Sequence, residues 1–284
     1  MPELPEVETV CRGLNSVTLN QSIRGGTVLL DRTIAYPFSA AEFVEGIMGQ
    51  SIIQWQRRGK YLLAELVNDA GKPAGWLGVH LRMTGQLLWM LQDEPLQKHC
   101  RVRLFFPNDR ELRFVDQRTF GQMWYVPPDR SPGSVISGLQ GLGVEPLSPD
   151  FTVEYLAERL QNRKRPIKNA LLDQAIVAGI GNIYADESLF LSQIRPETLA
   201  ANLTPEQVKQ LHQAIIKVLQ DSIGAGGTTF SDFRDIQGIN GNYGGIAWVY
   251  DRKGEPCRNC ETPIERIKLA GRSAHYCPIC QPSA

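Results

Sequence analysis

Two cysteine pairs near the end of the sequence constrain the fold of this 284-residue chain more than any other feature. Cys257 and Cys260 form one C-x2-C knuckle, and Cys277 and Cys280 form a second one sixteen residues further on. This spacing is typical of a zinc ribbon, in which four thiolates hold one Zn²⁺. Two disulfides are the alternative, but the register of the cysteines favours the metal. Because protein ligands fill all four positions, the predicted zinc is structural and does not activate water.

Length and composition describe an ordinary globular protein. A hydrophobic content of 42% and a charged content of 21% fit a chain that is long enough for two domains. No apolar run approaches the ~18 residues of a membrane span, and the acidic start is no signal peptide, which predicts a cytoplasmic protein without membrane contact. The formal net charge is zero, so it neither supports nor excludes a nucleic-acid partner. The basic run 163–165 is able to track phosphates, although such runs are more often solvated helix faces.

The first half of the chain has the pattern of a β-sheet protein. A helix over residues 5–15 is expected first, because apolar residues recur at spacings of three and four between Leu4 and Leu14. From about residue 22 to residue 125, short β-rich runs are broken by Gly and Pro, which predicts an antiparallel sandwich with one helical interruption at 38–46. The expected strands are 27–30, 61–66, 75–80, 86–90, 101–106 and 111–114.

Helical periodicity begins after a stretch rich in Pro and Gly at 127–150, which is interpreted as a linker. The expected helices are 151–162, 166–173, 182–192 and 205–224. Asn182 follows a glycine turn and is an N-cap type of residue, while Thr204 to Gln207 form a complete start signal. A helix N-terminus reached by a glycine turn is able to bind phosphate, although a plain helix–helix turn explains the pattern as well.

The first residues carry the most reactive group. Once Met1 is removed, the chain begins with Pro2, whose secondary amine titrates at about 8, so that part of it is an uncharged nucleophile at neutral pH. Attack of this amine on a sugar anomeric carbon gives an iminium that stays charged, which is Schiff-base catalysis. Glu3 and Glu6 are close enough in sequence to act as acid or base. An ordinary helix start, with Pro5 and acids in its first turn, is the alternative that these residues alone favour.

Five motifs occur in a fixed order along the whole chain. They are Met1–Val10, Arg58–Tyr61, His80–Gly85, Gly179–Ala185 and Gly271–Arg272, the last of them just before the second knuckle. Together they resemble formamidopyrimidine-DNA glycosylase, a bacterial enzyme of base excision repair. The resemblance implies an α+β fold: an N-terminal β-sandwich with a catalytic N-terminal helix, then a helix-two-turn-helix domain and a C-terminal four-cysteine zinc-ribbon hairpin. DNA is expected to bind in the cleft between the two lobes.

The resemblance also implies domain bounds and an activity. The expected parts are a catalytic β-sandwich at 1–126, a linker at 127–150, a helix-two-turn-helix domain at 151–236 and a zinc-finger domain at 237–284. The implied activity is that of a bifunctional DNA glycosylase and AP lyase, a monomer that acts on damaged double-stranded DNA. It excises 8-oxoguanine and formamidopyrimidines by attack of the proline on C1′ and then cleaves the strand by β,δ-elimination. One structural Zn²⁺ per chain is the expected cofactor.

Individual roles follow from the matching positions. The implied catalytic residues are Pro2 as nucleophile, Glu3 as general acid, Lys60 as proton donor and phosphate contact, and Arg272 at the tip of the zinc hairpin. The resemblance gives Asn182 a phosphate contact, and Lys168 a part in handling the oxidised purine. The remaining expected DNA contacts are His80, Met83, Arg118, Phe120, Thr229 and Tyr243, of which Met83, Arg118 and Phe120 fill the gap left by the flipped base.

The chain departs from the family pattern in one loop, and two alternative functions compete with the one that the resemblance implies. Residues 226–233 resemble the loop that covers a flipped 8-oxoguanine, but residues 240–245 depart from the family pattern, which makes the lesion preference less secure than the chemistry. A sister enzyme that resembles endonuclease VIII and removes oxidised pyrimidines is disfavoured by Leu4 and by Arg118 to Phe120. A non-catalytic zinc-ribbon protein that marks lesions is disfavoured because Pro2 and Glu3 are intact.

Overall fold

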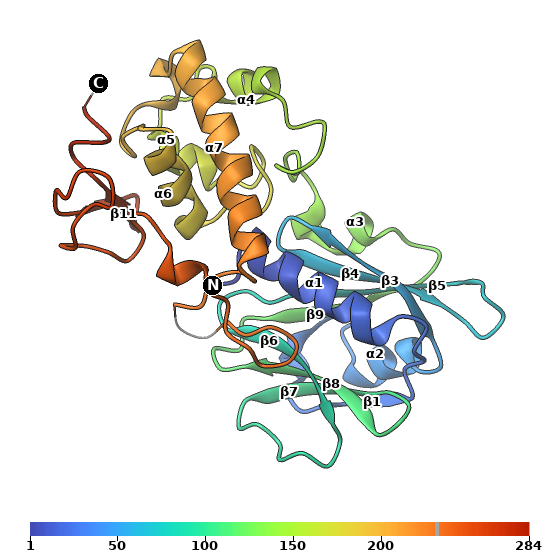
Figure 1. The fold of residues 1–284 in the computed structure, drawn as a ribbon. Helices are drawn as coiled ribbons and strands as arrows, with labels where there is room; N and C mark the ends of the chain where they lie inside the picture. The colour runs from blue at the N-terminus through green and yellow to red at the C-terminus, as the bar shows by residue number, and fades with distance from the viewer. Residues whose placement is uncertain (231–232, 284) are drawn as a thin grey trace. The chain divides into compact units, whose positions relative to one another are not determined.

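The structure is a computed structural model that describes residues 1–230 and 233–283. The chain forms two compact units (Figure 1). The first contains residues 1–141 together with 225–242, and the second contains residues 142–224 together with 243–284. Residues 225–242 therefore belong to the same unit as the N-terminus. The division at 126, 150 and 236 that the motifs suggest stays a prediction.

The first unit begins with helix α1 (Leu4–Thr18), which has Glu3 at its N-cap and a proline in its first turn. Its buried stripe includes Val7, Val10 and Leu14, as the spacing of apolar residues predicts. The stripe joins one hydrophobic core with side chains from two sheets. The start of α1 is thus fixed on the body of this unit, and with it the first residues of the chain.

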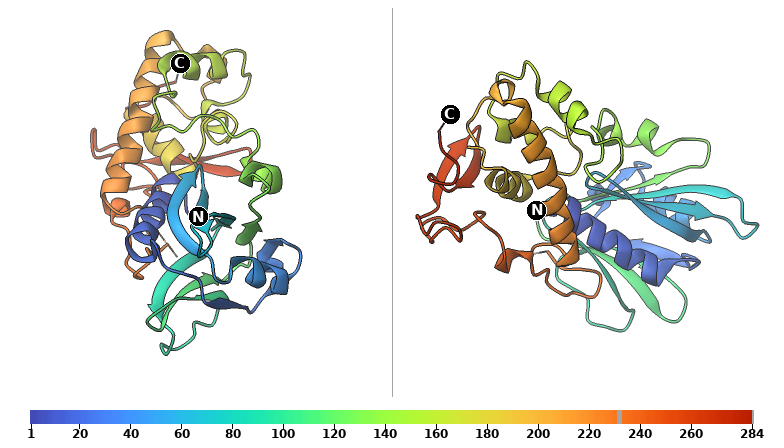
Figure 2. Two further views of the ribbon diagram at one scale, coloured as in Figure 1. Left: turned by 90° about the vertical axis from the view of Figure 1, so that its right-hand side faces the viewer. Right: turned by 45° about the horizontal axis from the view of Figure 1, so that its top comes forward.

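Two sheets make up the sandwich of the first unit (Figures 1 and 2). The four-stranded sheet has the order β1 (Gly25–Val28), β7 (Cys100–Phe105), β8 (Arg110–Asp116) and β6 (Gly85–Leu91). The five-stranded sheet has the order β2 (Ile34–Tyr36), β9 (Gln122–Val126), β5 (Pro73–His80), β4 (Tyr61–Val67) and β3 (Ser51–Arg58). All neighbours pair antiparallel except β2 and β9, which are parallel. Helix α2 (Ala40–Ile47) confirms the expected helical interruption.

Three of these strands, β2, β3 and β9, are missing from the sequence prediction. β3 reads Ser-Ile-Ile-Gln-Trp-Gln-Arg-Arg, and its polar second half hides the apolar alternation. Ile52 and Trp55 are nevertheless buried, because a bulge between Ile52 and Gln54 shifts the register by one residue. β2 has only three residues, too few for a periodic signal.

The segment 225–242 contributes to the core of the first unit. Phe233 and Ile236 are buried in the same cluster as residues of both sheets and α1. The backbone N–H of Trp89 in β6 donates to the carbonyl of Ile236 at 2.9 Å. This part of the expected helix-two-turn-helix domain is therefore anchored on the sandwich.

The second unit contains four α-helices and a β-hairpin in the part of it that the structure describes. They are α4 (Val153–Leu160), α5 (Ile167–Leu171), α6 (Asn182–Leu191), α7 (Pro205–Gly224), β10 (Glu265–Leu269) and β11 (Arg272–Tyr276). The predicted capping box is present, since Thr204 N–H donates to Gln207 Oε1 and Gln207 N–H donates to Thr204 Oγ1. The N-cap of α6 is Gly181, so the prediction of Asn182 at that position is wrong. The stretch 127–150 holds short turns of helix, α3 (Pro132–Val135) among them.

Helix α7 is twenty residues long and amphipathic, with Val208, Leu211, Ile215 and Val218 along its buried face. The opposite face carries charged residues in contact with solvent, such as Lys217 and Asp221. Within residues 1–230 and 233–283, no helix combines the length and the apolar character needed to cross a membrane.

Candidate active site and zinc centre

The N-terminal residues lie at the start of α1. Pro2 is buried, and the Glu3 residue is only 1% exposed. The N–H of Glu3 donates to Oε2 of Glu6 at 2.8 Å, which fixes the backbone next to Pro2. Pro2 and Glu3 therefore lie next to each other, both buried, at the start of α1.

Glu6 holds the N-terminus to the segment 225–242. Its second oxygen, Oε1, accepts a hydrogen bond from the N–H of Thr228 at 2.8 Å, and its residue is 1% exposed. A Cβ atom on Gly227 would lie only 3.2 Å from this side chain. Gly227 also has a φ of +82°, a backbone conformation that favours glycine. Glu6 is thus a buried anchor, where the sequence suggested an acid or base.

Lys60 lies in the turn between β3 and β4, where Arg58 pairs with Tyr61. The preceding Arg57 forms an ion pair with Glu8 of α1 at 2.9 Å and also donates to the carbonyl of Gly59. Burial raises the pKa of Glu8, but hydrogen bonds from Arg57 and Arg12 outweigh it and lower the pKa overall. Glu8 is therefore charged at neutral pH, and the pair ties the turn that carries Lys60 to the helix that carries Glu3.

His80 ends β5 and packs edge-on against Tyr61, with 4.4 Å between the ring centroids. Burial, with smaller contributions from the charges of Arg82 and Lys60, lowers its pKa from 6.5 to about 3. The N–H of Arg82 donates to Nδ1 of His80 at 3.0 Å. A neutral imidazole that accepts at Nδ1 carries its proton on Nε2. His80 thus offers one N–H donor without a positive charge.

We expect His80 to make the protein less stable in mild acid. Below pH 6.5 the unfolded chain binds a proton at His80 and the folded chain does not, so stability falls as the pH is lowered from 6.5 toward 3. At pH 5 the loss amounts to about 2 kcal/mol. Urea unfolding at pH 7.5 and pH 5 measures it, with His80→Gln as the comparison. An equal pH dependence in both proteins would show that His80 is protonated in the folded state.

The residues expected to fill the gap left by the flipped base come from two loops of the first unit, the first between β5 and β6 and the second between β8 and β9. Hydrogen bonds join the two loops. Asp116 accepts from Thr84 Oγ1 at 2.5 Å and from Gly121 N–H at 2.7 Å, and Thr84 Oγ1 accepts from the N–H of Arg118 at 3.0 Å. Phe120 is 53% exposed, and the Arg118 guanidinium lies 5.1 Å from its ring centroid. Met83 lies in the first loop and is half-buried. The exposed Phe120 ring and the Arg118 guanidinium lie on a loop that these hydrogen bonds hold in place, so they are able to insert into a base stack.

In the second unit, the hairpin of β10 and β11 places Arg272 as the sequence predicts. Leu269 pairs with Arg272 across the turn Ala270-Gly271, and Arg272 is exposed. The next residue, Ser273, accepts a hydrogen bond from Nδ2 of Asn182 at 3.3 Å. Asn182 is the first residue of α6, where the N–H groups of the first turn attract anions. The structure thus brings together the two residues expected to contact phosphate in this unit.

Lys168 is not placed to contact a ligand. It is 0% exposed, lies 2.6 Å from Asp186 Oδ1 and also donates to the carbonyl of Ser273. A direct contact with the oxidised base would require breaking a buried ion pair, which is strongly unfavourable. The expectation that Lys168 itself touches the lesion is therefore not supported. The sequence could not show this, because the partners lie 18 and 105 residues away.

Tyr243 is also buried. It is 2% exposed, its ring lies 5.8 Å from that of Tyr184, and its hydroxyl donates to Glu187. Burial and the nearby Glu187 carboxylate raise its pKa far above the usual range. A ring in this position does not stack on a base. Thr229 uses its hydroxyl within the first unit, donating to the carbonyl of Phe233 and accepting from the N–H of Gly241.

Glu187 and its neighbour Asp186 are functional candidates that the sequence reasoning missed. Glu187 is fully buried, and its side-chain oxygens accept hydrogen bonds from the backbone N–H groups of Trp248, Val249 and Tyr250. Burial raises its pKa, and these three hydrogen bonds lower it in part. The sequence offers a partial signal, since Asp186 and Glu187 are adjacent acids in a helix whose other residues are mostly apolar, and acids that become buried need partners.

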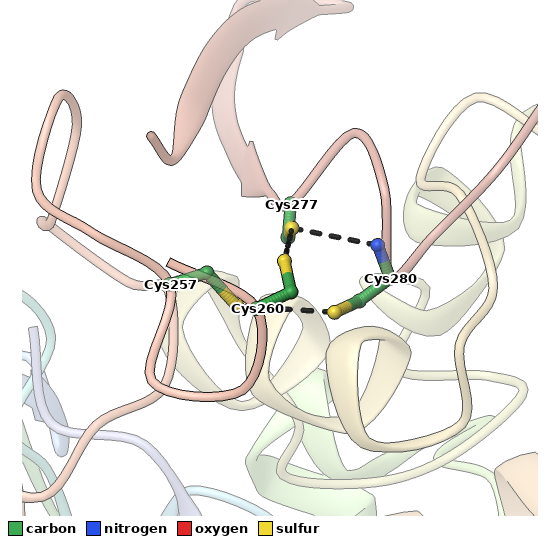
Figure 3. Close-up of side chains that lie close together, drawn as sticks. All are labelled: Cys257, Cys260, Cys277 and Cys280. Carbon is green, nitrogen blue, oxygen red and sulfur yellow. Dashed lines mark hydrogen bonds between the residues drawn. The ribbon is translucent and has the colours of Figure 1, made fainter. Parts of the chain in front are cut away.

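The four cysteines of the knuckles converge in the second unit (Figure 3). Their sulfur atoms all lie within 4.8 Å of one another, with 3.9 Å between Cys257 and Cys280 and 3.4 Å between Cys260 and Cys277. A tetrahedral ZnS₄ centre with bonds of about 2.3 Å needs sulfur separations of about 3.8 Å. The arrangement fits one structural zinc ion. The adjoining cluster of Phe190, Val249, Ile264 and the cysteines packs this centre against α6.

Comparison with known proteins agrees with this geometry. Residues 1–123 match the formamidopyrimidine-DNA glycosylase N-terminal domain, residues 142–234 match the formamidopyrimidine-DNA glycosylase H2TH domain, and residues 254–282 match the zinc finger found in FPG and IleRS. The formamidopyrimidine-DNA glycosylase of Acaryochloris marina is 65% identical over 284 residues, which is 100% of both chains.

Solved structures show the same fold. Fpg of Lactococcus lactis in complex with DNA containing an abasic site is 34% identical with a TM-score of 0.89, covering 99% of this chain and 100% of that one. A complex of Lactococcus lactis Fpg with DNA containing Fapy-dG gives 35% identity and a TM-score of 0.88 over the same shares. On the evidence of its sequence along the full length, its sandwich and its zinc centre, this chain belongs to the formamidopyrimidine-DNA glycosylase family.

Proposed function

We propose that this chain removes oxidised purines, 8-oxoguanine and formamidopyrimidines, from duplex DNA and cleaves the strand at the resulting abasic site. The observation that carries this assignment is the Pro2-Glu3 pair at the capped start of α1, in a chain that matches this family over its whole length. The Lactococcus lactis relatives bind DNA with an abasic site or with Fapy-dG, which supports the same substrate class here. The resemblance to the family supports a monomer as the active unit.

Pro2 performs the covalent step once Met1 has been removed. Its nitrogen forms a bond to C1′ while the bond from C1′ to the base breaks, and the base departs with the electron pair and takes up the proton that the attacking amine loses. The nitrogen lone pair then expels the ring oxygen O4′, which receives its proton from Glu3, and an iminium remains. The iminium accepts the electrons released when the C2′ proton is lost, so the 3′ phosphate leaves, and the 5′ phosphate follows.

The remaining residues bind and orient the DNA. We assign phosphate contacts to Lys60, Asn182 and Arg272, because their charges or N–H groups supply most of the affinity for DNA. The neutral imidazole of His80 adds a donor that does not compete with these cations. Met83, Arg118 and Phe120 occupy the space that the extruded nucleotide leaves. Extrusion of the nucleotide costs a few kcal/mol. The zinc centre supplies no chemistry and holds the hairpin that carries Arg272.

The test is a pair of duplexes, one with a single 8-oxoguanine and one with a single oxidised pyrimidine, under single-turnover conditions. We expect cleavage at the 8-oxoguanine, leaving phosphate at both ends of the gap, and slower reaction at the pyrimidine. Glu3→Gln is expected to lower excision by at least about a hundredfold, because a neutral amide is too weak an acid to protonate O4′. It is expected to bind the damaged duplex as tightly as the wild type, since the phosphate contacts remain. Preference for the pyrimidine, or excision by Glu3→Gln at the wild-type rate, would contradict the assignment.

A further inference from the structure

A buried polar network in the second unit links three elements. Lys168 of α5 is fully buried against Asp186 of α6, at 2.6 Å, and also donates to the carbonyl of Ser273 at the start of β11. The other oxygen of Asp186 accepts the backbone N–H of His275 at 3.0 Å and lies 3.1 Å from its Nδ1. His275 is 3% exposed. One carboxylate and one ammonium group therefore hold two alternate residues of the same strand.

These contacts lie directly beside the two residues that are expected to bind phosphate in this unit. Ser273, which accepts from Lys168 through its carbonyl, directly follows Arg272, and its hydroxyl accepts from Asn182. Asp186 lies one helical turn after Asn182 on α6. The network thus holds β11 at Ser273 and at His275, and it sets the position of the adjoining Arg272 relative to the first turn of α6.

Apolar packing cannot provide this register. Phe190 stacks on Trp248 with 5.4 Å between centroids and joins the cluster around the cysteines, but such contacts are non-directional. Hydrogen bonds between a buried carboxylate and a backbone N–H are directional, and a shift of β11 by one residue would cost Asp186 its bond from the His275 N–H and Lys168 its bond to the Ser273 carbonyl. Burying two charges costs free energy, and the specificity of one strand position is the compensating gain.

We propose that Lys168, Asp186 and His275 are positioning residues, which hold β11 so that Arg272 and Asn182 contact the same stretch of DNA backbone. This deepens the proposed function and rests on its phosphate contacts. Lys168 acts on excision through the strand it holds and reads no base. Its replacement therefore weakens the reaction at 8-oxoguanine and at a preformed abasic site to the same extent.

The experiment measures binding to a duplex with a non-cleavable abasic analogue, as a function of salt, for Lys168→Met, Asp186→Asn and the double variant Lys168→Met/Asp186→Leu. We expect affinity to fall about three- to thirtyfold, with a salt slope smaller by about one. The double variant removes both charges, so it folds without an unpaired buried ion and still shows the loss. Lys217→Met/Asp221→Asn removes an exposed Lys–Asp pair of the same unit and serves as the matched control, with no change expected.

Combination with Arg272→Ala separates positioning from general destabilisation. If the network acts through Arg272, Asp186→Asn causes little further loss in the Arg272→Ala background. An additive loss, or a loss at 8-oxoguanine that abasic cleavage does not share, would overturn the proposal. Because binding is measured without chemistry, failure of the wild type to excise bases would count against the proposed function and leave this test intact. Zinc content, measured for each variant, confirms that the hairpin is present.

Discussion

Treatment with borohydride on an 8-oxoguanine duplex is expected to trap this protein on DNA through Pro2, and Pro2→Gly is expected to lower base excision by about a thousandfold. Glycine leaves a primary amine, whose imine loses its charge by deprotonation and is a poorer electron sink. The secondary amine of proline gives an iminium that has no such proton to lose. Intact-mass spectrometry of the trapped complex and single-turnover rates measure the two effects.

Pro5→Ala is the matched control, because Pro5 is buried in the first turn of the same helix but has no free amine. It is expected to be trapped as efficiently as the wild type. Peptide sequencing of the adduct should identify the residue after Met1, and the mass of the free protein should show that Met1 has been removed. An adduct on Lys60 would mean that Pro2 is not the nucleophile.

Removal of the zinc is expected to abolish DNA binding. Structural zinc contributes on the order of 10 kcal/mol to the folding of small zinc modules, so Cys257→Ser should release the metal and unfold the hairpin β10–β11. Arg272 then no longer has a fixed position, and affinity for the abasic duplex should fall at least about a hundredfold. The readouts are zinc content, binding and the melting temperature.

Cys11→Ala is the control for the loss of a buried thiol, since Cys11 is 5% exposed in the core of the first unit, whereas the four ligands belong to the second. It is expected to keep its zinc and its affinity for DNA, with a moderate loss of stability from the missing sulfur. Full DNA binding by a protein shown to be free of zinc would contradict a structural role for the metal.

Local patterns in the sequence predicted the parts of the fold that depend on near neighbours. The cysteine spacing predicted the zinc centre, Thr204 and Gln207 predicted the start of α7, and the apolar spacing predicted α1. In each case the signal is a short spacing in the sequence, within each of the two knuckles or from one helical turn to the next. Asn182 was the exception, because a glycine with extended backbone occupies the N-cap in its place.

The errors concern residues whose partners are distant in sequence. The resemblance gave Lys168 a part in handling the oxidised purine, yet its partner Asp186 is on another helix and its second acceptor is on the hairpin. Tyr243 is an expected DNA contact from the sequence, but its side chain is buried and its hydroxyl donates to Glu187. Burial of a polar side chain is decided by tertiary pairing, which no local pattern contains.

The return of residues 225–242 to the first unit bears on how proteins of this kind can be divided and recombined. A fragment that ends at residue 141 lacks Phe233 and Ile236, so its core is left with a gap, and Glu6 loses its bond to Thr228. Exchange of the following domain between relatives would therefore replace part of the sandwich as well. Such chimaeras keep a complete core only when the inserted stretch 225–242 comes from the parent that supplied the N-terminus.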